Sequence, residues 1–134
     1  MATVHVEIVS PEQVLYSGEA EIVVCRTPEG EVAFLPGHVP FLGMLGVAQV
    51  WAREPDGTDV YAAVHRGFVE VSNDRVSILS DVAELPDQID LVRAETARDA
   101  AEEALRDTPD DPELKAALAR AELRIQVARG PART

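Results

Sequence analysis

The hydrophobic positions along the chain change their period near Pro86. From residue 4 to about residue 80, apolar and polar residues alternate in short runs, as in the first run of Val4, Val6 and Ile8. Alternation of this kind predicts half-buried β-strands. After Pro86 the apolar residues recur every three or four positions, which predicts helices. Because proline fits neither a strand ladder nor a helix interior, we expect a β-unit over residues 1–84 and a helical unit over residues 85–134.

Turn-forming residues divide the first unit into short runs. Pro, Gly, Asn and Asp punctuate residues 27–30, 54–58 and 73–74, and Ser17-Gly18 also separates two runs. The expected strands are 4–8, 14–16, 20–25, 32–35, 41–45, 47–52, 60–64, 67–71 and 76–79. Short strands at this spacing predict a sandwich or a flattened barrel.

The second unit has the pattern of two helices joined by a linker over residues 108–112. We expect Asp87 to cap the first helix, with Asp90 in its first turn, and Asp111 to cap the second, with Pro112 at its first position. Gly130-Pro131 ends the second helix. The expected apolar stripes are Ile89, Val92, Thr96, Ala100 and Ala104 on the first helix, and Leu114, Ala117, Leu118, Ala121, Ile125 and Ala128 on the second. Since alanine dominates both, the hairpin buries little area and is weakly held.

Charge and cysteine content narrow the classes of partner. The net charge is −12, and residues 1–86 hold 13 acidic and 4 basic residues, so the acidity lies mainly in the β-unit. Nucleic acids and anionic lipids need basic patches, which excludes both as partners.

The single cysteine, Cys25, lies in an apolar run and is expected to be a buried, inert thiol. With no signal-peptide pattern and no apolar run near the ~20 residues of a membrane span, we expect no membrane insertion.

The motifs of known catalytic sites are missing from the sequence. His5, His38 and His65 are dispersed without the spacing of metal ligands, and there is neither a phosphate-binding glycine loop nor a nucleophile elbow. We therefore expect no catalytic residues, no metal and no cofactor. The chain is predicted not to be an enzyme.

Two groups of residues admit a functional and a structural interpretation. His38, in a loop between two prolines, is either a presented contact residue or a turn histidine bonded to a nearby carbonyl. Arg120 and Arg124 lie one helical turn apart, and with Arg93 they form an anion site if the helices fold back on each other. Alternatively, acidic neighbours and solvent neutralise these arginines, and Asp90 and Arg93 form only an ion pair within the helix.

Several segments, in order along the chain, resemble the epsilon subunit of bacterial F-type ATP synthases. They are residues 6–12 (VEIVSPE), 29–42 (EGEVAFLPGHVPFL), 66–71 (RGFVEV) and 76–84 (VSILSDVAE), followed by the motif Ile89-Asp90-x-x-Arg93-Ala94. The combination of the Gly37-His38-x-Pro40 loop with the Gly-Phe-x-Glu-Val strand is specific. One departure is Arg66-Gly67, where the family usually has two glycines, so the bend there is expected to differ.

The resemblance implies an α+β fold: a ten-stranded antiparallel β-sandwich (1–84) followed by a two-helix antiparallel hairpin (85–134). It implies a non-catalytic rotor subunit that couples rotation to proton transport, regulates ATP hydrolysis through its helices, and lies at the cytoplasmic face of the bacterial plasma membrane. The implied partners are the gamma subunit, the c-ring and the alpha/beta head, with Glu31 and His38 as contact residues for gamma and the c-ring. The implied ligand is regulatory ATP, bound by Glu84, Ile89, Asp90, Arg93, Ala94, Arg120 and Arg124.

A second hypothesis comes from a different functional class. A free-standing β-sandwich that binds a small ligand and dimerises through its helical tail also fits the pattern of elements. Purification distinguishes the two hypotheses, since a rotor subunit is expected to be monomeric alone and to form a stable complex with gamma.

Overall fold

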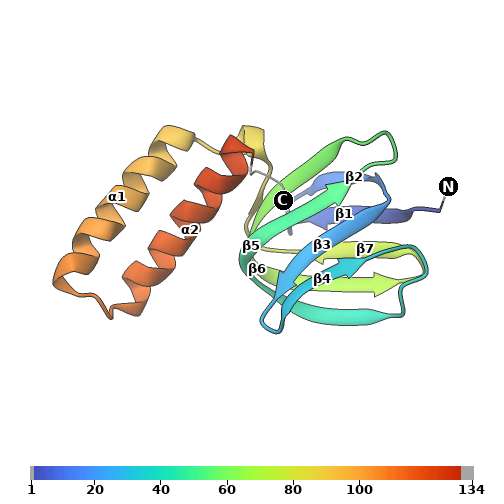
Figure 1. The fold of residues 1–134 in the computed structure, drawn as a ribbon, viewed down its shortest axis with the longest axis horizontal. Helices are drawn as coiled ribbons and strands as arrows, with labels where there is room; N and C mark the ends of the chain where they lie inside the picture. The colour runs from blue at the N-terminus through green and yellow to red at the C-terminus, as the bar shows by residue number, and fades with distance from the viewer. Residues whose placement is uncertain (1, 131–134) are drawn as a thin grey trace. The chain divides into compact units, whose positions relative to one another are not determined.

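The computed structural model describes residues 2–130. The chain divides into two compact units, residues 1–84 and 85–134. The first unit consists of strands and the second of helices (Figure 1). The strands are β1 (Val4–Val9), β2 (Val14–Ala20), β3 (Ile22–Thr27), β4 (Gly30–Phe34), β5 (Phe41–Arg53), β6 (Asp59–Ser72), β7 (Arg75–Leu79) and β8 (Ala83–Glu84).

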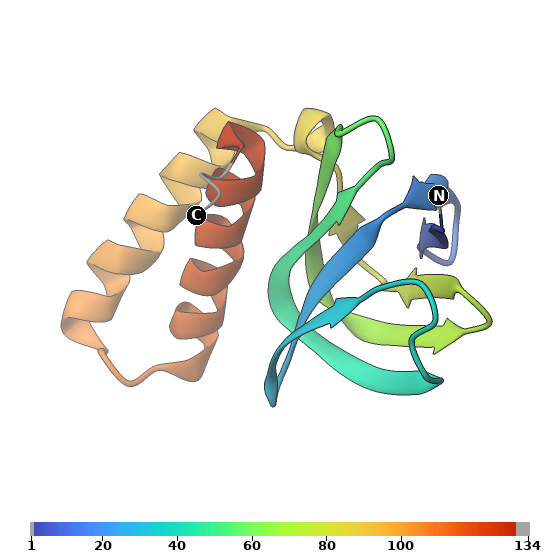
Figure 2. The ribbon, with the colours of Figure 1, turned by 45° about the vertical axis from the view of Figure 1, so that its right-hand side comes forward.

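The strands form a sheet that folds over into a two-layered sandwich. The order is β2-β1-β7-β6-β5-β3-β4, with β8 paired to β6. The long strands β5 and β6 bend at one side of the sandwich and so belong to both layers (Figure 2). The second half of β6 pairs with β7, whereas its first half pairs with β8. The predicted sandwich is confirmed.

The bend falls at Gly46 and Arg66. The β5–β6 ladder passes from the pair Leu45–Gly67 to the pair Val47–His65, and Arg66 has a φ of 72°. The neighbouring Gly67 has no room for a side chain, because a Cβ there would lie 2.1 Å from the carbonyl oxygen of Leu79. The end of β7 therefore packs directly on the backbone of β6.

Three details of the predicted strands are wrong. Within residues 2–130 the structure has eight strands, where the resemblance implied ten and the sequence pattern indicated nine. The runs 41–45 and 47–52, like 60–64 and 67–71, are joined into single bent strands, and β8 is a short strand that the pattern did not predict. Ser17-Gly18 lies inside β2, where Gly18 pairs with Val6, so these residues do not separate two strands. The sheet is mostly antiparallel, but β1 and β7 run parallel, which their wide separation along the chain permits.

The core of the sandwich is mainly aliphatic, as the low aromatic content suggested. Residues on the inward side of β1, β3, β6 and β7 are at most 2% exposed: Val4, Val6, Ile8, Val23, Cys25, Val69, Val71, Val76 and Ile78. Burial raises the pKa of the Cys25 thiol to about 12, so it stays protonated and unreactive at neutral pH. The prediction of a buried thiol is confirmed.

The helical unit begins with a short 3₁₀ turn, η1 (Pro86–Gln88), followed by α1 (Leu91–Asp107) and α2 (Pro112–Arg129). The cap of α1 is Asp90, whose carboxylate accepts from the backbone N–H of Arg93, so the prediction of Asp87 as cap is wrong. Asp87 lies instead in η1, which the proline before it starts. At α2 the predicted Asp111 cap and Pro112 are confirmed, and Gly130 ends the helix with a φ of 74°.

Small side chains line the contact between α1 and α2. Ala94, Ala101 and Ala121 are each at most 5% exposed. The predicted stripe of α1 is wrong, since Val92 is 72% exposed and Thr96 and Ala100 are exposed as well. Close approach of two helices selects alanine for the contact, and the bulkier valine then projects outward. The stripe of α2 holds in part: Ile125 is buried, but so are Leu123 and Val127 outside it.

Candidate functional sites

The motif Ile89-Asp90-x-x-Arg93-Ala94 forms the start of α1. Asp90 Oδ1 lies 3.1 Å from the backbone nitrogen of Arg93, and Ala94 is buried at 4% exposure against the second helix. Ile89 is half-buried, and its N–H donates to the carbonyl of Pro86. The Arg93 side chain is exposed, and within residues 2–130 no ion pair joins it to Asp90. The motif thus shapes the helix start and leaves one guanidinium in solvent.

Arg120 and Arg124 lie on α2, both half-buried. The register of the hairpin follows from the ion pair between Arg129 and Glu95, which joins the last turn of α2 to the first turns of α1. At 1.5 Å per residue, Arg124 lies about 10 Å and Arg120 about 16 Å from Arg93 along the helix axis. The three arginines are therefore spaced along the length of the hairpin, and their backbone positions do not cluster.

Glu84 belongs to the sandwich unit, whereas the other six predicted nucleotide-binding residues belong to the helical unit. It lies in β8, and one of its carboxylate oxygens is 3.1 Å from Nε2 of the buried His65 on β6. This hydrogen bond, together with the one from the backbone N–H of His65 to the Val82 carbonyl, holds the end of the sandwich against β6. Glu84 therefore has a structural role inside its own unit.

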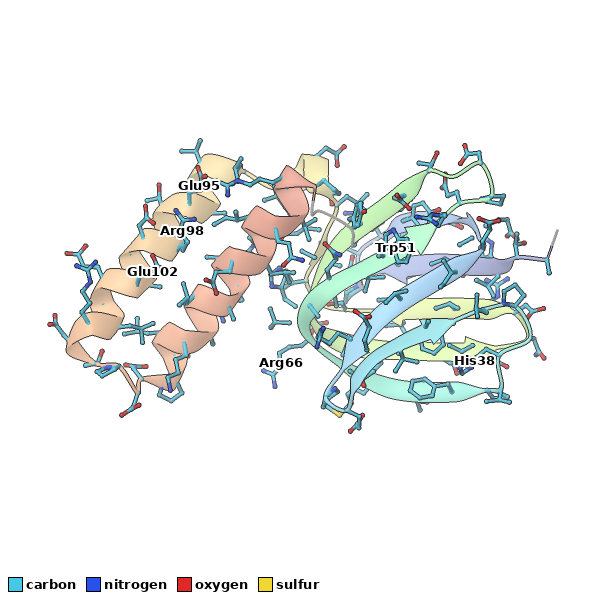
Figure 3. All side chains as sticks on the ribbon, viewed as in Figure 1. His38, Trp51, Arg66, Glu95, Arg98 and Glu102 are labelled. Carbon is cyan, nitrogen blue, oxygen red and sulfur yellow. The ribbon has the colours of Figure 1, made fainter. Side chains whose placement is uncertain are left out.

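The predicted contact residues Glu31 and His38 lie at different places on the sandwich unit. Glu31 is exposed on β4, 3.9 Å from Arg26. His38 lies on the sandwich unit and is half-buried (Figure 3). Its ring donates from Nδ1 to the carbonyl of Val39 at 2.7 Å and meets the buried Phe34 edge-on at 5.0 Å between ring centres. The hydrogen bond to the Val39 carbonyl agrees with the structural interpretation of His38 as a turn histidine. The ring also packs on the core through Phe34.

Residues that the sequence analysis did not single out position this loop and the bend. Asp74, in the turn between β6 and β7, accepts from the N–H of Gly37 at 2.7 Å and so ties the His38 loop to a distant turn. The buried Ser80 places its hydroxyl 2.6 Å from the carbonyl oxygen of Arg66 and 2.9 Å from that of Val82. The sequence pattern marks Asp74 only as a turn residue and does not mark Ser80, whereas the unusual Arg66-Gly67 pair does mark the bend.

Other kinds of site find no support in the described residues. Residues 2–130 contain no group of three or more His, Cys, Asp and Glu side chains arranged to hold a metal ion. None of the helices within this range has the length and apolar character needed to cross a membrane.

Comparison with protein families gives one match for each unit. Residues 3–86 match the family described as "ATP synthase, Delta/Epsilon chain, beta-sandwich domain". Residues 87–129 match "ATP synthase, Delta/Epsilon chain, long alpha-helix domain". The matches follow each other in the order of the two units.

Similar proteins carry the same description. The chain is 44% identical over 128 residues to the "ATP synthase epsilon chain" of Thermobifida fusca, covering 92% of this chain and 90% of that protein. It is 41% identical over 122 residues to the protein of that name from Streptomyces avermitilis, covering 89% and 98%. Among solved structures, a chain of the Euglena gracilis mitochondrial ATP synthase shares the fold, with a TM-score of 0.70 at 19% identity over 96% of this chain and 79% of that one. By sequence, and by the order of its two units, the chain belongs to the ATP synthase delta/epsilon chain family.

Proposed function

We propose that this chain is the epsilon subunit of a bacterial F-type ATP synthase, a non-catalytic part of the rotor that regulates ATP hydrolysis. The observation that carries the proposal is the pair of family matches, which together span residues 3–129. In this role the sandwich unit binds the gamma subunit and the c-ring, and the complex holds the chain at the cytoplasmic face of the plasma membrane. The helical unit acts on the alpha/beta head.

The regulatory role needs a helical unit that changes its arrangement at low cost. The alanine-lined contact between α1 and α2 supports this, because small side chains bury little apolar area. Two states that differ by only a few kcal/mol are what a switch requires. The test is hydrolysis by the purified complex: removal of residues 85–134 is expected to change the rate, and an unchanged rate would contradict the regulatory role.

We further propose that ATP binds to the helical unit. The solvent-exposed guanidinium of Arg93 and the two half-buried arginines of α2 place three guanidinium groups on the hairpin, and the planar fork of a guanidinium suits the oxygens of a phosphate. Asp90, Ile89 and Ala94 shape the helix start beside Arg93, and Glu84, which belongs to the other unit, is included in the proposed set on the resemblance alone. Hydrolysis is not expected, since the chain has no phosphate-binding glycine loop.

Calorimetry of the full chain with ATP tests this site. Arg93→Ala is expected to weaken binding by roughly 1.5–3 kcal/mol, the range for hydrogen bonds to a charged group. Arg106→Ala, which removes an exposed arginine from the other end of α1, is the matched control and is expected to bind like the wild type. Absence of saturable heat in the wild type, or equal affinities for wild type and Arg93→Ala, would refute the proposal.

The proposed partner contacts require separate tests for Glu31 and His38. Glu31→Gln removes an exposed charge and is expected to weaken binding to the c-ring without changing the melting temperature. For His38, the ring contact with Phe34 makes Ala a poor probe, because it also removes packing. His38→Phe keeps an aromatic ring and removes the nitrogens, so loss of gamma binding in this variant indicates a polar contact. Unaltered binding in His38→Phe would mean that the ring is structural only.

A further inference from the structure

The last strand of the sandwich unit, β8, is attached to that unit with little help from the core. It is two residues long, and it pairs with residues 63–64 of β6. We name residues 81–84 the strap. None of its four side chains is buried, and Val82 is 43% exposed. Because the strap buries little apolar area, hydrophobic packing contributes little to its attachment.

Hydrogen bonds attach the strap to β6. The carbonyl of Val82 accepts from the backbone N–H of His65 at 2.9 Å and from the hydroxyl of Ser80, also at 2.9 Å. At the end of the strap, a carboxylate oxygen of Glu84 lies 3.1 Å from Nε2 of His65. Water replaces hydrogen bonds of this kind when a segment detaches, so each contributes only modestly to the attachment.

Ser80, the residue directly before the strap, is fixed much more firmly. It is 5% exposed, and its backbone N–H donates to the carbonyl of Val9 in β1 at 3.0 Å. Its hydroxyl lies 2.6 Å from the carbonyl oxygen of Arg66 in β6. Since Ser80 is joined to two central strands, a strap that detaches from β6 turns at Asp81.

The place of the strap in the chain gives its release a consequence. The sandwich unit ends at Glu84 and α1 begins at Leu91, so residues 85–90 form the tether of the helical unit. Fully extended, these residues span at most roughly 20 Å. Release of the strap adds residues 81–84 to the tether and raises this limit to roughly 34 Å.

We propose that the strap is a releasable part of this tether and that the hydrogen bond between His65 and Glu84 holds it closed. While the strap is attached, the short tether keeps the helical unit from reaching the alpha/beta head. Release from β6 supplies the additional length that this action needs. The inference rests on the proposed regulatory function and deepens it, because it names the element of the sandwich unit that limits the helical unit.

A reversible disulfide that locks the strap tests its role in the purified complex. Val64 and Ala83 are directly opposed in the ladder, where Cα atoms lie about 4.5–5.5 Å apart, within the range of a disulfide. With Val64→Cys and Ala83→Cys combined, the oxidised complex is expected to hydrolyse ATP at the rate of a complex that lacks residues 85–134. Reduction is expected to restore the wild-type rate. The two single variants, treated with the same oxidant, are the controls and are expected to keep the wild-type rate.

The outcomes separate the strap from the proposed function. If removal of residues 85–134 changes the rate but the oxidised double variant hydrolyses ATP like its reduced form, the strap is not part of the switch. If removal of residues 85–134 leaves the rate unchanged, both the regulatory role and the strap proposal are overturned.

Amide hydrogen exchange on the full chain tests the hydrogen bond itself. In Glu84→Ala the backbone amide of His65, which donates to the strap, is expected to exchange at least tenfold faster than in the wild type, while the amides of the β6–β7 ladder keep their rates. Glu70→Ala removes an exposed carboxylate from β6 and is the matched control, expected to exchange like the wild type. An unchanged His65 amide in Glu84→Ala would overturn the role of this hydrogen bond. Equal acceleration in the β6–β7 ladder would show that the strap does not detach separately.

Discussion

Removal of the α2 cap is expected to loosen the helical unit and leave the sandwich unit unchanged. Asp111 Oδ1 accepts two backbone hydrogen bonds, from Glu113 at 2.9 Å and from Leu114 at 3.2 Å. Replacing a capping residue with alanine costs about 1 kcal/mol, and about 2 kcal/mol in the strongest cases. Because this carboxylate serves two donors, we expect Asp111→Ala to cost ~1–2 kcal/mol.

Amide hydrogen exchange measures this loss separately in each unit. A change of 1–2 kcal/mol corresponds to roughly 5- to 30-fold less protection of the α2 amides. Amides of β1, β6 and β7 are expected to keep their protection, since they belong to the other unit. Asp110→Ala is the control, because the Asp110 side chain is fully exposed and meets only Lys115 at 3.8 Å.

Two results would refute the reasoning. Equal loss of protection in the Asp110 and Asp111 variants would mean that net charge, and not capping, stabilises the helix. Equal loss in the helices and in the core strands would mean that the two units unfold together.

Three further predictions concern the sandwich unit. Gly67→Ala is expected to destabilise the sandwich unit by ~2 kcal/mol or more, because the new Cβ would meet the Leu79 carbonyl. Gly46→Ala is the control in thermal unfolding, because a Cβ at position 46 would have no atom within 4 Å. Equal melting temperatures for the two variants would contradict the close approach of β7 to Gly67. A chain ending at Glu84 is expected to unfold cooperatively and to bind gamma, and a fragment without a transition would refute an independent unit. The Cys25 thiol, with its pKa raised to about 12, is expected to resist alkylation at pH 8 until the protein unfolds; rapid labelling of the folded chain would contradict its burial.

Periodicity predicted most strand positions, because alternation directly reflects one buried and one exposed side of a strand. It did not predict that the runs on either side of Gly46 form one strand. That continuity depends on the ladder between β5 and β6, which no single run contains. The left-handed conformation of Arg66 has the same origin: Ser80 and Leu79, distant in sequence, impose it.

In the helical unit, the capping residue of a helix was predicted correctly where the sequence offered only one candidate. Asp111 followed by proline was a clear start, but Asp87 and Asp90 were both carboxylates placed to cap a helix, and the nearby Pro86 favoured the earlier one. The buried side of α1 was predicted wrongly because alanine is common on every side of that helix, so the sides differ little in hydrophobicity. The proposed nucleotide site could be derived from the sequence only as a motif, since the register that separates its arginines depends on the contact between Glu95 and Arg129.

The parallel pairing of β1 with β7 has a consequence for synthesis of the protein. β1 leaves the ribosome before β7, its neighbour in the middle of the sheet, which is made about 70 residues later. Closing a contact over so long a loop is slow compared with forming a hairpin or a helix. Until then β1 has only β2 to pair with, and its other edge remains available to a strand of another chain. Residues 1–86 hold 13 acidic and 4 basic residues, and we expect the mutual repulsion of these charges to keep nascent chains apart during that interval.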